Sequence, residues 1–231
     1  MRAAVYATPA PDSALNRLAS DWLGRDAFSD RPTRPADSSR DPFVAEAARY
    51  GFHATLRAPF CPKDEVDLGT LVDRLGALCA GSAAPVIGQL TLGRLGDFFA
   101  LVPAAPEPAL HDLEGDVLAA FEPYRAPLTA NEMARRRPER LSLRQRELLE
   151  RWGYPFVREE FRFHMTLTGP VPGPGDEWRT ELETRFAPLL GRPLAIDGLG
   201  LFVEAAPGAP FRVHSFHPFR APEVLQPAGT P

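Results

Sequence analysis

The chain has 231 residues, of which 44% are hydrophobic and 24% are charged, and its formal net charge is −4. These values are ordinary for a globular protein with a sizeable core, and they exclude a fibrous or largely unfolded chain. The negative net charge argues against a protein that coats long nucleic acid or an anionic membrane, so we expect neither partner. A small anionic substrate is compatible with this charge.

Two further features bound the function. Cys61 and Cys79 are the only cysteines, too few for a disulfide framework and without the paired spacing of a zinc site. No stretch approaches the roughly 20 apolar residues that span a bilayer, and residues 1–7 lack the design of a secretory signal. We therefore expect reduced thiols and a location in the cytoplasm.

Hydrophobic periodicity predicts strands and helices that alternate along the chain. A strand at residues 3–7 precedes a helix that Asp12 can cap and Gly24 can end. Residues 29–42 are polar and broken by prolines, which predicts a mobile surface loop. The next predicted elements are a strand at 50–60, a helix at 67–79, strands at 86–95 and 97–103, and a helix at 108–121.

Residues 123–157 do not continue this alternation of strands and helices. They contain three consecutive arginines at 135–137 and a short helix, which a capping box from Ser142 to Gln145 begins and Gly153 ends. The proline-rich tail at 221–231 is predicted to be disordered. The alternation resumes before that tail, with a strand at 161–169, a helix at 177–190, and strands at 194–204 and 211–219.

The resumed order of strand, helix, strand and strand is an internal repeat, and this repeat sets the expected architecture. YGFHATLRAPF precedes a helix and then IGQLTL, and FRFHMTLTG precedes a helix and then IDGLGL at nearly the same interval. We expect an α+β fold with two pseudo-symmetric lobes, each supplying one histidine-bearing strand of its own antiparallel sheet. The predicted parts are one bilobal domain at residues 1–220, repeat 1 at about 50–103, repeat 2 at about 161–219 and an unrepeated insert at about 123–157.

Strand alternation places a polar row on one side of each histidine segment, because successive side chains point to opposite faces of a sheet. A solvent-exposed face would more typically carry Glu, Lys and Gln, so this row indicates the lining of a polar cleft. The polar rows are Gly51, His53, Thr55 and Arg57 in the first copy, and Arg162, His164, Thr166 and Thr168 in the second.

The duplicated His-x-Thr-Leu tetrad points to a paired chemistry. A single histidine on a strand is most often structural, but two at equivalent positions predict that His53 and His164 converge in one cleft. With an unperturbed pKa of about 6.5, one imidazole can be neutral while the other is protonated, as a general base and a general acid require. The hydroxyls of Thr55 and Thr166 can donate hydrogen bonds to the non-bridging oxygens of a phosphate.

The tetrads HATL at residues 53–56 and HMTL at 164–167 resemble the two motifs of the 2H phosphoesterase superfamily. More narrowly, the residues around the two tetrads and WGYP at 152–155 resemble a branch encoded in bacterial phosphonate-utilisation operons, a family of undefined activity. The resemblance spans about residues 2–219. It implies a bilobal fold around a central cleft, metal-independent hydrolysis or transfer at a phosphodiester or cyclic phosphate, and no cofactor. The suggested substrate is a cyclic phosphate of a ribose derivative, formed during carbon–phosphorus bond cleavage.

Three further residues are candidate substrate ligands. Arg57 follows Thr55 on the polar face, where contact with phosphate and a structural role are both open. Arg136 belongs to the arginine run, which is more often a solvated helix face. With Tyr154 and Arg125 it is nevertheless a candidate for recognising the non-reacting end of the substrate. The remaining histidines, expected on the surface or in structural roles, are His111, His214 and His217.

Two alternatives to a phosphodiesterase stay open at this point. The first is a module that binds a nucleotide or an RNA end in the same cleft without turnover. The second is a metal hydrolase with His53 and His164 as ligands. We discount the second because a catalytic zinc needs a third protein ligand, and neither strand offers a nearby acidic or histidine partner.

Overall fold

The computed structural model describes residues 1–220, and the tail predicted to be disordered lies outside the described residues. The described chain is a mixed α/β fold with antiparallel sheets. Its α-helices are α1 (Ala14–Leu23), α2 (Asp41–Tyr50), α3 (Leu68–Gly81), α4 (Pro108–Phe121), α5 (Ala130–Arg135), α6 (Leu143–Trp152) and α7 (Asp176–Phe186). Short 3-10 turns are η1 (Glu122–Tyr124), η2 (Pro138–Arg140) and η3 (Arg158–Glu160).

The strands build one large sheet and two small ones. The large sheet has seven strands in the order β11, β10, β1, β4, β8, β7, β6, and every neighbouring pair is antiparallel. Its strands are β1 (Arg2–Ala7), β4 (Ala54–Phe60), β6 (Leu90–Leu95), β7 (Phe98–Pro103), β8 (Met165–Thr166), β10 (Gly198–Glu204) and β11 (Arg212–Pro218). The two-stranded sheets are β2 (Arg25–Asp26) with β3 (Arg31–Pro32), and β5 (Val86–Ile87) with β9 (Leu194–Ala195).

The two sequence repeats exchange elements within this sheet. Strand β8 of the second repeat lies between β4 and β7 of the first repeat, with β6 beyond β7. Strands β10 and β11 of the second repeat lie on the other side of the sheet, beyond β4 and β1. The helices follow the same exchange, because α3 packs on β10 and β11 and α7 packs on β6. The structure therefore has a single seven-stranded sheet where the sequence predicted one sheet in each lobe, and the direct pairing of β4 with β8 joins the two parts.

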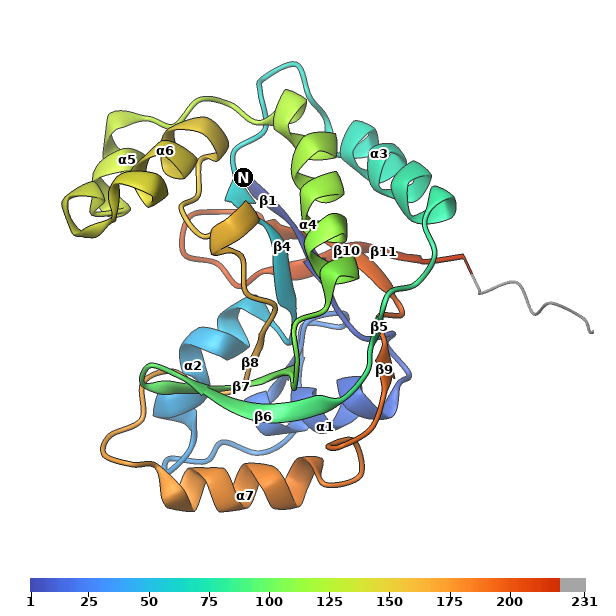
Figure 1. Cartoon of the computed structure of the whole chain (residues 1–231), viewed down its shortest axis with the longest axis vertical. Helices are drawn as coiled ribbons and strands as arrows, with labels where there is room; N and C mark the ends of the chain where they lie inside the picture. The colour runs from blue at the N-terminus through green and yellow to red at the C-terminus, as the bar shows by residue number, and fades with distance from the viewer. Residues whose placement is uncertain (221–231) are drawn as a thin grey trace, which may run out of the picture.

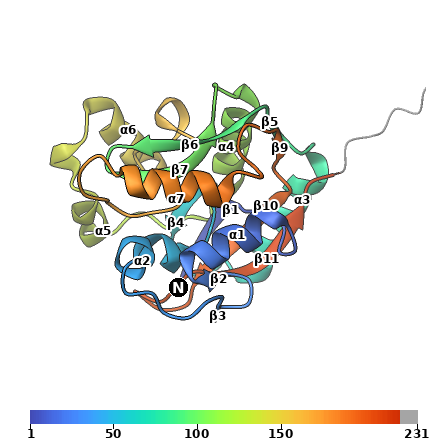
Figure 2. The ribbon, with the colours of Figure 1, turned by 90° about the horizontal axis from the view of Figure 1, so that it is seen from below.

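Helices gather at both ends of the sheet (Figure 1). Helices α3 and α4 lie at one end, and α1 and α7 lie at the other, where Figure 2 shows them side by side. The indole rings of Trp22 and Trp178 meet edge to face there, with centroids 6.0 Å apart. Apolar side chains from α1, α3, α4 and α7 form one continuous core with the sheet. Among residues 1–220, no helix has the length and apolar character to cross a membrane.

Local sequence signals explain most helix ends. Helix α1 ends at Gly24 with φ of 80°, and α6 begins with a Ser142–Gln145 capping box and ends at Gly153 with φ of 75°, which confirms these predictions. Ser13 rather than Asp12 caps α1, because its side chain accepts the backbone N–H of Asn16.

Two segments differ from the sequence prediction. The segment predicted as a mobile loop contains β3, which pairs with β2 just before it, and helix α2 begins at its end, where no helix was expected. The second histidine segment pairs as a strand only at Met165–Thr166. Burial still alternates before this strand, with Phe161 and Phe163 buried, Arg162 exposed and His164 half-buried.

Candidate active site

The histidine tetrads meet at the centre of the sheet. Strands β4 and β8 are antiparallel neighbours, and Ala54 pairs with Met165. This register sets His53 opposite Thr166 and Thr55 opposite His164, because residues directly across an antiparallel pair share a face. The buried Ala54 and Met165 point into the core, so the two histidines and two threonines lie together on the other face.

His53 is held on three sides. Its Nδ1 lies 2.9 Å from the carbonyl oxygen of Gly51, and its Nε2 lies 3.1 Å from Oγ1 of Thr55. The ring of Tyr6 stacks on the imidazole, with centroids 3.7 Å apart and planes 21° apart. A carbonyl can only accept a hydrogen bond, so Nδ1 carries the proton and Nε2 of the neutral ring has a lone pair.

The electrostatics favour a neutral His53. Burial is the main cause that lowers the pKa of His53 to about 4; the hydrogen bond to Gly51 opposes this shift, and the nearby His164 adds to it. The imidazole is therefore unprotonated at neutral pH. Its Nε2 can accept a proton from a group in the cleft, once the Thr55 hydroxyl turns elsewhere.

His164 has the same backbone anchor but a more open setting. Its Nδ1 lies 2.7 Å from the carbonyl oxygen of Arg162, which matches the bond from His53 to Gly51 two residues back. Within the described residues, Nε2 of His164 makes no hydrogen bond, and the neighbouring ring of Phe98 is tilted with its centroid 5.9 Å away. Burial lowers the pKa of His164 below its ordinary value.

Two adjoining cavities open on this face. The first, of about 390 Å³, is lined by His53 and Thr166, and the second, of about 680 Å³, is lined by His164. Both are lined by Thr55, Phe98 and Tyr154, so they share a wall at the tetrads. This arrangement sets one imidazole toward each cavity, with the threonine hydroxyls at their junction.

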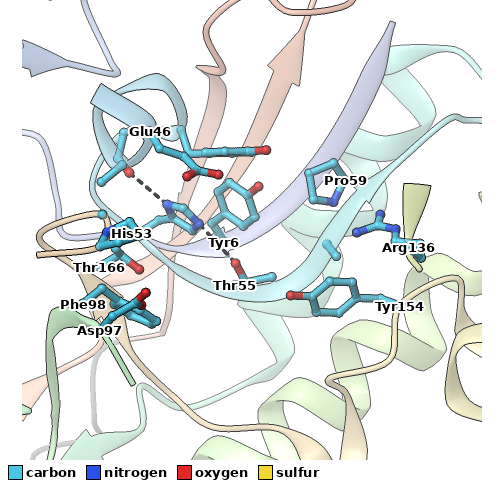
Figure 3. Close-up of a pocket in the computed structure, with 16 residues that line it drawn as sticks. Tyr6, Glu46, His53, Thr55, Pro59, Asp97, Phe98, Arg136, Tyr154 and Thr166 are labelled. Carbon is cyan, nitrogen blue, oxygen red and sulfur yellow. Dashed lines mark hydrogen bonds between the residues drawn. The ribbon is translucent and has the colours of Figure 1, made fainter. Parts of the chain in front are cut away.

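The insert adds a cation to the first cavity. Arg136 and Tyr154 both line it, and the guanidinium carbon of Arg136 lies 5.2 Å from the centre of the Tyr154 ring. Figure 3 shows these two residues on one side of the cavity and His53 with Thr166 on the other. The geometry thus brings five of the predicted site residues to the first cavity: His53, Thr55, Arg136, Tyr154 and Thr166.

Arg57 does not reach either cavity, although strand alternation predicted that it would. Thr55 pairs with Tyr6 and Arg57 pairs with Val5, so β4 has one extra residue, Leu56, in a β-bulge between them. The bulge turns Arg57 to the core side, where it is 1% exposed and donates to Glu122 over 2.7 Å. Of the two roles that the sequence left open for Arg57, this geometry favours the structural one over a phosphate contact.

Two other residues that the sequence placed near the substrate line neither cavity. Thr168 is fully buried and accepts the backbone N–H of Phe99 at 2.9 Å, so it ties β7 to the chain after β8. Arg125 forms an ion pair with Glu122 at 2.6 Å and donates to the carbonyl oxygen of Arg151. Both side chains satisfy internal partners rather than a ligand in the cleft.

Sequence reasoning missed residues that other strands bring to the site. Tyr6 comes from β1, Phe98 from β7, and the carboxylates of Glu46 and Asp97 stand at the first cavity. Tyr6 had one usable signal, since it interrupts the small and apolar residues of β1 with a hydroxyl. Among residues 1–220, no cluster of three or more His, Cys, Asp and Glu side chains is arranged to hold a metal ion.

Similarity to known proteins now adds to this geometry. The model of the family described as "Protein of unknown function (DUF1045)" matches residues 55–212. The chain is 38% identical over 221 residues to "Ribose 1,5-bisphosphate phosphokinase PhnN" of Janthinobacterium sp. (strain Marseille), covering 91% of this chain and 49% of that protein. It is 37% identical over 224 residues to the protein of the same name from Laribacter hongkongensis (strain HLHK9), covering 92% of this chain and 50% of that one.

The chain thus spans about half the length of the curated relatives it matches. The crystal structure of the protein TT0787 of Thermus thermophilus is 15% identical, with a TM-score of 0.45, and the match covers 96% of this chain and 99% of that one. The family model covers more than half of the residues, and the relatives match almost the whole chain. The protein is therefore a member of the DUF1045 family.

Proposed function

We propose that the chain is a phosphodiesterase of the 2H phosphoesterase superfamily, which opens a cyclic phosphate by paired-histidine general acid and base catalysis. One observation carries the proposal: the β4–β8 register, which sets His53 opposite Thr166 and His164 opposite Thr55. A local twofold axis between the two strands relates the His–Thr pair of one tetrad to that of the other. This supports the bilobal symmetry that the sequence repeat suggested.

The proposed reaction balances as a hydrolysis. Nε2 of His53 accepts a proton from water, the resulting hydroxide attacks phosphorus, and one P–O ester bond breaks. His164 in its protonated form gives a proton from Nε2 to the departing oxygen of the substrate. Thr55 and Thr166 donate hydrogen bonds to the non-bridging oxygens, where negative charge is held throughout the reaction.

The environments of the two rings support this assignment of roles. The enclosed His53 is neutral at neutral pH, as a base must be. His164 faces the larger cavity and keeps its Nε2 unengaged within the described chain. A bound phosphate would favour its charged form, since an opposite charge nearby raises the pKa of an imidazole.

A phosphorylated ribose is the substrate class that we propose. The relatives' names state a phosphokinase that acts on ribose 1,5-bisphosphate. This chain matches only about half of each relative, and its single lysine, Lys63, follows no glycine-rich loop that could cradle a nucleotide triphosphate. We therefore assign the kinase activity of those names to their remaining half. We also assign to this chain the opening of a ribose cyclic phosphate in phosphonate metabolism.

The test is a screen of ribose 1,2-cyclic and nucleoside 2′,3′-cyclic phosphates with the purified chain, in the presence and absence of excess chelator. We expect hydrolysis that persists in chelator and that H53A and H164A each lower by about 10²–10⁴-fold. H214A is the matched control, because His214 is exposed on β11. Binding without product would favour the non-catalytic module. Loss of activity in chelator with recovery on adding zinc would favour a metal hydrolase, and ATP-dependent phosphorylation of ribose 1,5-bisphosphate would favour a kinase.

A further inference from the structure

The first cavity has charges of opposite sign at its two ends. Glu46 and Asp97 stand on the side of His53 and Thr166, and Arg136 stands across the cavity beside Tyr154 (Figure 3). Arg136 is half-buried and forms no ion pair with a carboxylate of residues 1–220. Its contact is the face of the Tyr154 ring, which orients the guanidinium without neutralising it. A lone cation at the wall of a cavity is suited to an anion.

Tyr6 supplies an independent sign of a ligand at this cavity. Its side chain is 1% exposed, and its hydroxyl forms no hydrogen bond with another described residue. The oxygen is not among the described side-chain atoms that are sealed from solvent without a partner, so it is open to the cavity that Tyr6 lines. The ring is fixed by stacking on His53, and Figure 3 shows its hydroxyl end directed into the cavity rather than into the core. The hydroxyl is thus a donor that a ligand in the cavity can reach.

Two phenols share this part of the cavity. Burial is the main cause that raises the pKa of both Tyr6 and Tyr154; Arg136 opposes the rise at Tyr154, and neighbouring phenols add to it at both residues. Both hydroxyls therefore remain protonated donors. Together with Arg136 they present hydrogen-bond donors on more than one side of a single volume. A phosphoryl group, with three terminal oxygens, can accept from all of them, whereas a neutral hydroxyl cannot.

We infer that Arg136, Tyr6 and Tyr154 form a second anion subsite, which binds a phosphoryl group that does not react. The inference rests on the proposed function and makes it narrower: the substrate is a sugar cyclic phosphate that carries a second, terminal phosphate. The cyclic phosphate lies between the histidines, and the sugar ring spans the cavity toward the insert. The volume of about 390 Å³ lies in the range of small-molecule sites.

The experiment compares ribose 1,2-cyclic phosphate with and without a phosphate on carbon 5. We expect kcat/KM of the wild type to be about 10- to 100-fold higher for the phosphorylated compound, since hydrogen bonds to a charged group are worth that ratio. R136Q should cut this preference at least about tenfold, mainly through KM. Y6F, which keeps the ring that stacks on His53, should cut it by a smaller factor.

R135Q is the matched control, because Arg135 is the exposed last residue of α5, directly before Arg136, and lines neither cavity. It should keep the full preference. Equal kcat/KM for the two compounds, or an equal loss on both in R136Q, would overturn the subsite and leave the phosphodiesterase proposal intact.

If neither compound is hydrolysed, the phosphodiesterase proposal fails, and the anion subsite is then tested by binding measurements alone. Calorimetry with ribose 5-phosphate should then give weaker binding to R136Q than to R135Q. Equal binding to the two variants would overturn the subsite as well.

Discussion

Strands β4 and β8 carry the same tetrad in different surroundings. Both histidines anchor Nδ1 on the carbonyl two residues earlier, a feature that the repeated sequence sets locally. Their other contacts come from different neighbours: β1 brings Tyr6 onto His53, whereas β7 brings Phe98 beside His164. A duplicated motif thus acquires two electrostatic environments from the strands that flank it. Asymmetric roles for the two imidazoles follow from this difference.

Removing either imidazole is the strongest test of the comparison. H53A and H164A should each lower kcat/KM on a cyclic phosphate by about 10²–10⁴-fold, the usual contribution of a general base or acid. The double variant should lose little more than the worse single variant, because both groups act in one transition state. Steady-state kinetics and circular dichroism check activity and folding. Near-normal turnover in either folded variant contradicts the paired mechanism.

Replacing the two threonines should give the next largest effects, and the loss of activity should differ between them. T55V removes a phosphate donor and also the 3.1 Å contact with Nε2 of His53, whereas T166V removes a donor alone. A lost hydrogen bond to a charged oxygen is worth about 1.5–3 kcal/mol, so each variant should lose about 10- to 150-fold in kcat. The loss should be greater for T55V. Serine variants retain the hydroxyl and are the controls, and equal losses in the two valine variants would argue for a symmetric site.

The pH profile tests which ring is the base. His53 must be neutral, and its pKa of about 4 means that kcat/KM rises as pH increases through that value. His164 must be protonated, and burial holds its pKa below the ordinary value of about 6.5, so kcat/KM falls as pH rises beyond it. We expect a bell with its maximum on the acid side of neutrality and limbs of about tenfold per pH unit. A residual profile of H164A that lacks the acid limb would reverse the assignment.

Behind the strands, Arg57 should matter for stability rather than for binding. R57M breaks the ion pair with Glu122, whose side chain is 28% exposed, so the loss is smaller than for a fully buried pair. We expect the free energy of unfolding in urea to fall by about 1–3 kcal/mol while KM stays close to that of the wild type. E122Q is the partner control. A raised KM with unchanged stability would show that Arg57 serves the substrate after all.

The smallest effect is expected at the corresponding position after β8. T168V removes the acceptor for the backbone N–H of Phe99, and should lower the free energy of unfolding by about 1 kcal/mol. Turnover should be unchanged, because the Thr168 side chain lies outside both cavities. Thermal unfolding followed by circular dichroism measures the loss of stability. A large loss of kcat would place Thr168 closer to the reacting groups than the structure does.

Several features of the site could be read from the sequence. The spacing of His53, Thr55, His164 and Thr166 with apolar residues between them predicted a shared face. The absence of a repeat partner for the insert pointed to Arg136 and Tyr154. Arg57 could not be placed, since the β-bulge at Leu56 depends on how β1 pairs with β4. The stacking of Tyr6 on His53 could not be predicted either, because it depends on β1 lying beside β4.

The sequence by itself determined what depends on near neighbours in the chain. Helix ends at Gly24 and Gly153, the capping box at Ser142, and the alternation of buried and polar side chains around each tetrad all follow from local backbone and side-chain preferences. Only the tertiary structure decided which strands lie side by side. The pairing of Ala54 with Met165 joins segments more than a hundred residues apart, and the exchange of strands between the repeats depends on burying a common core. A periodic pattern contains no information about such partners, because each strand face is compatible with several neighbours.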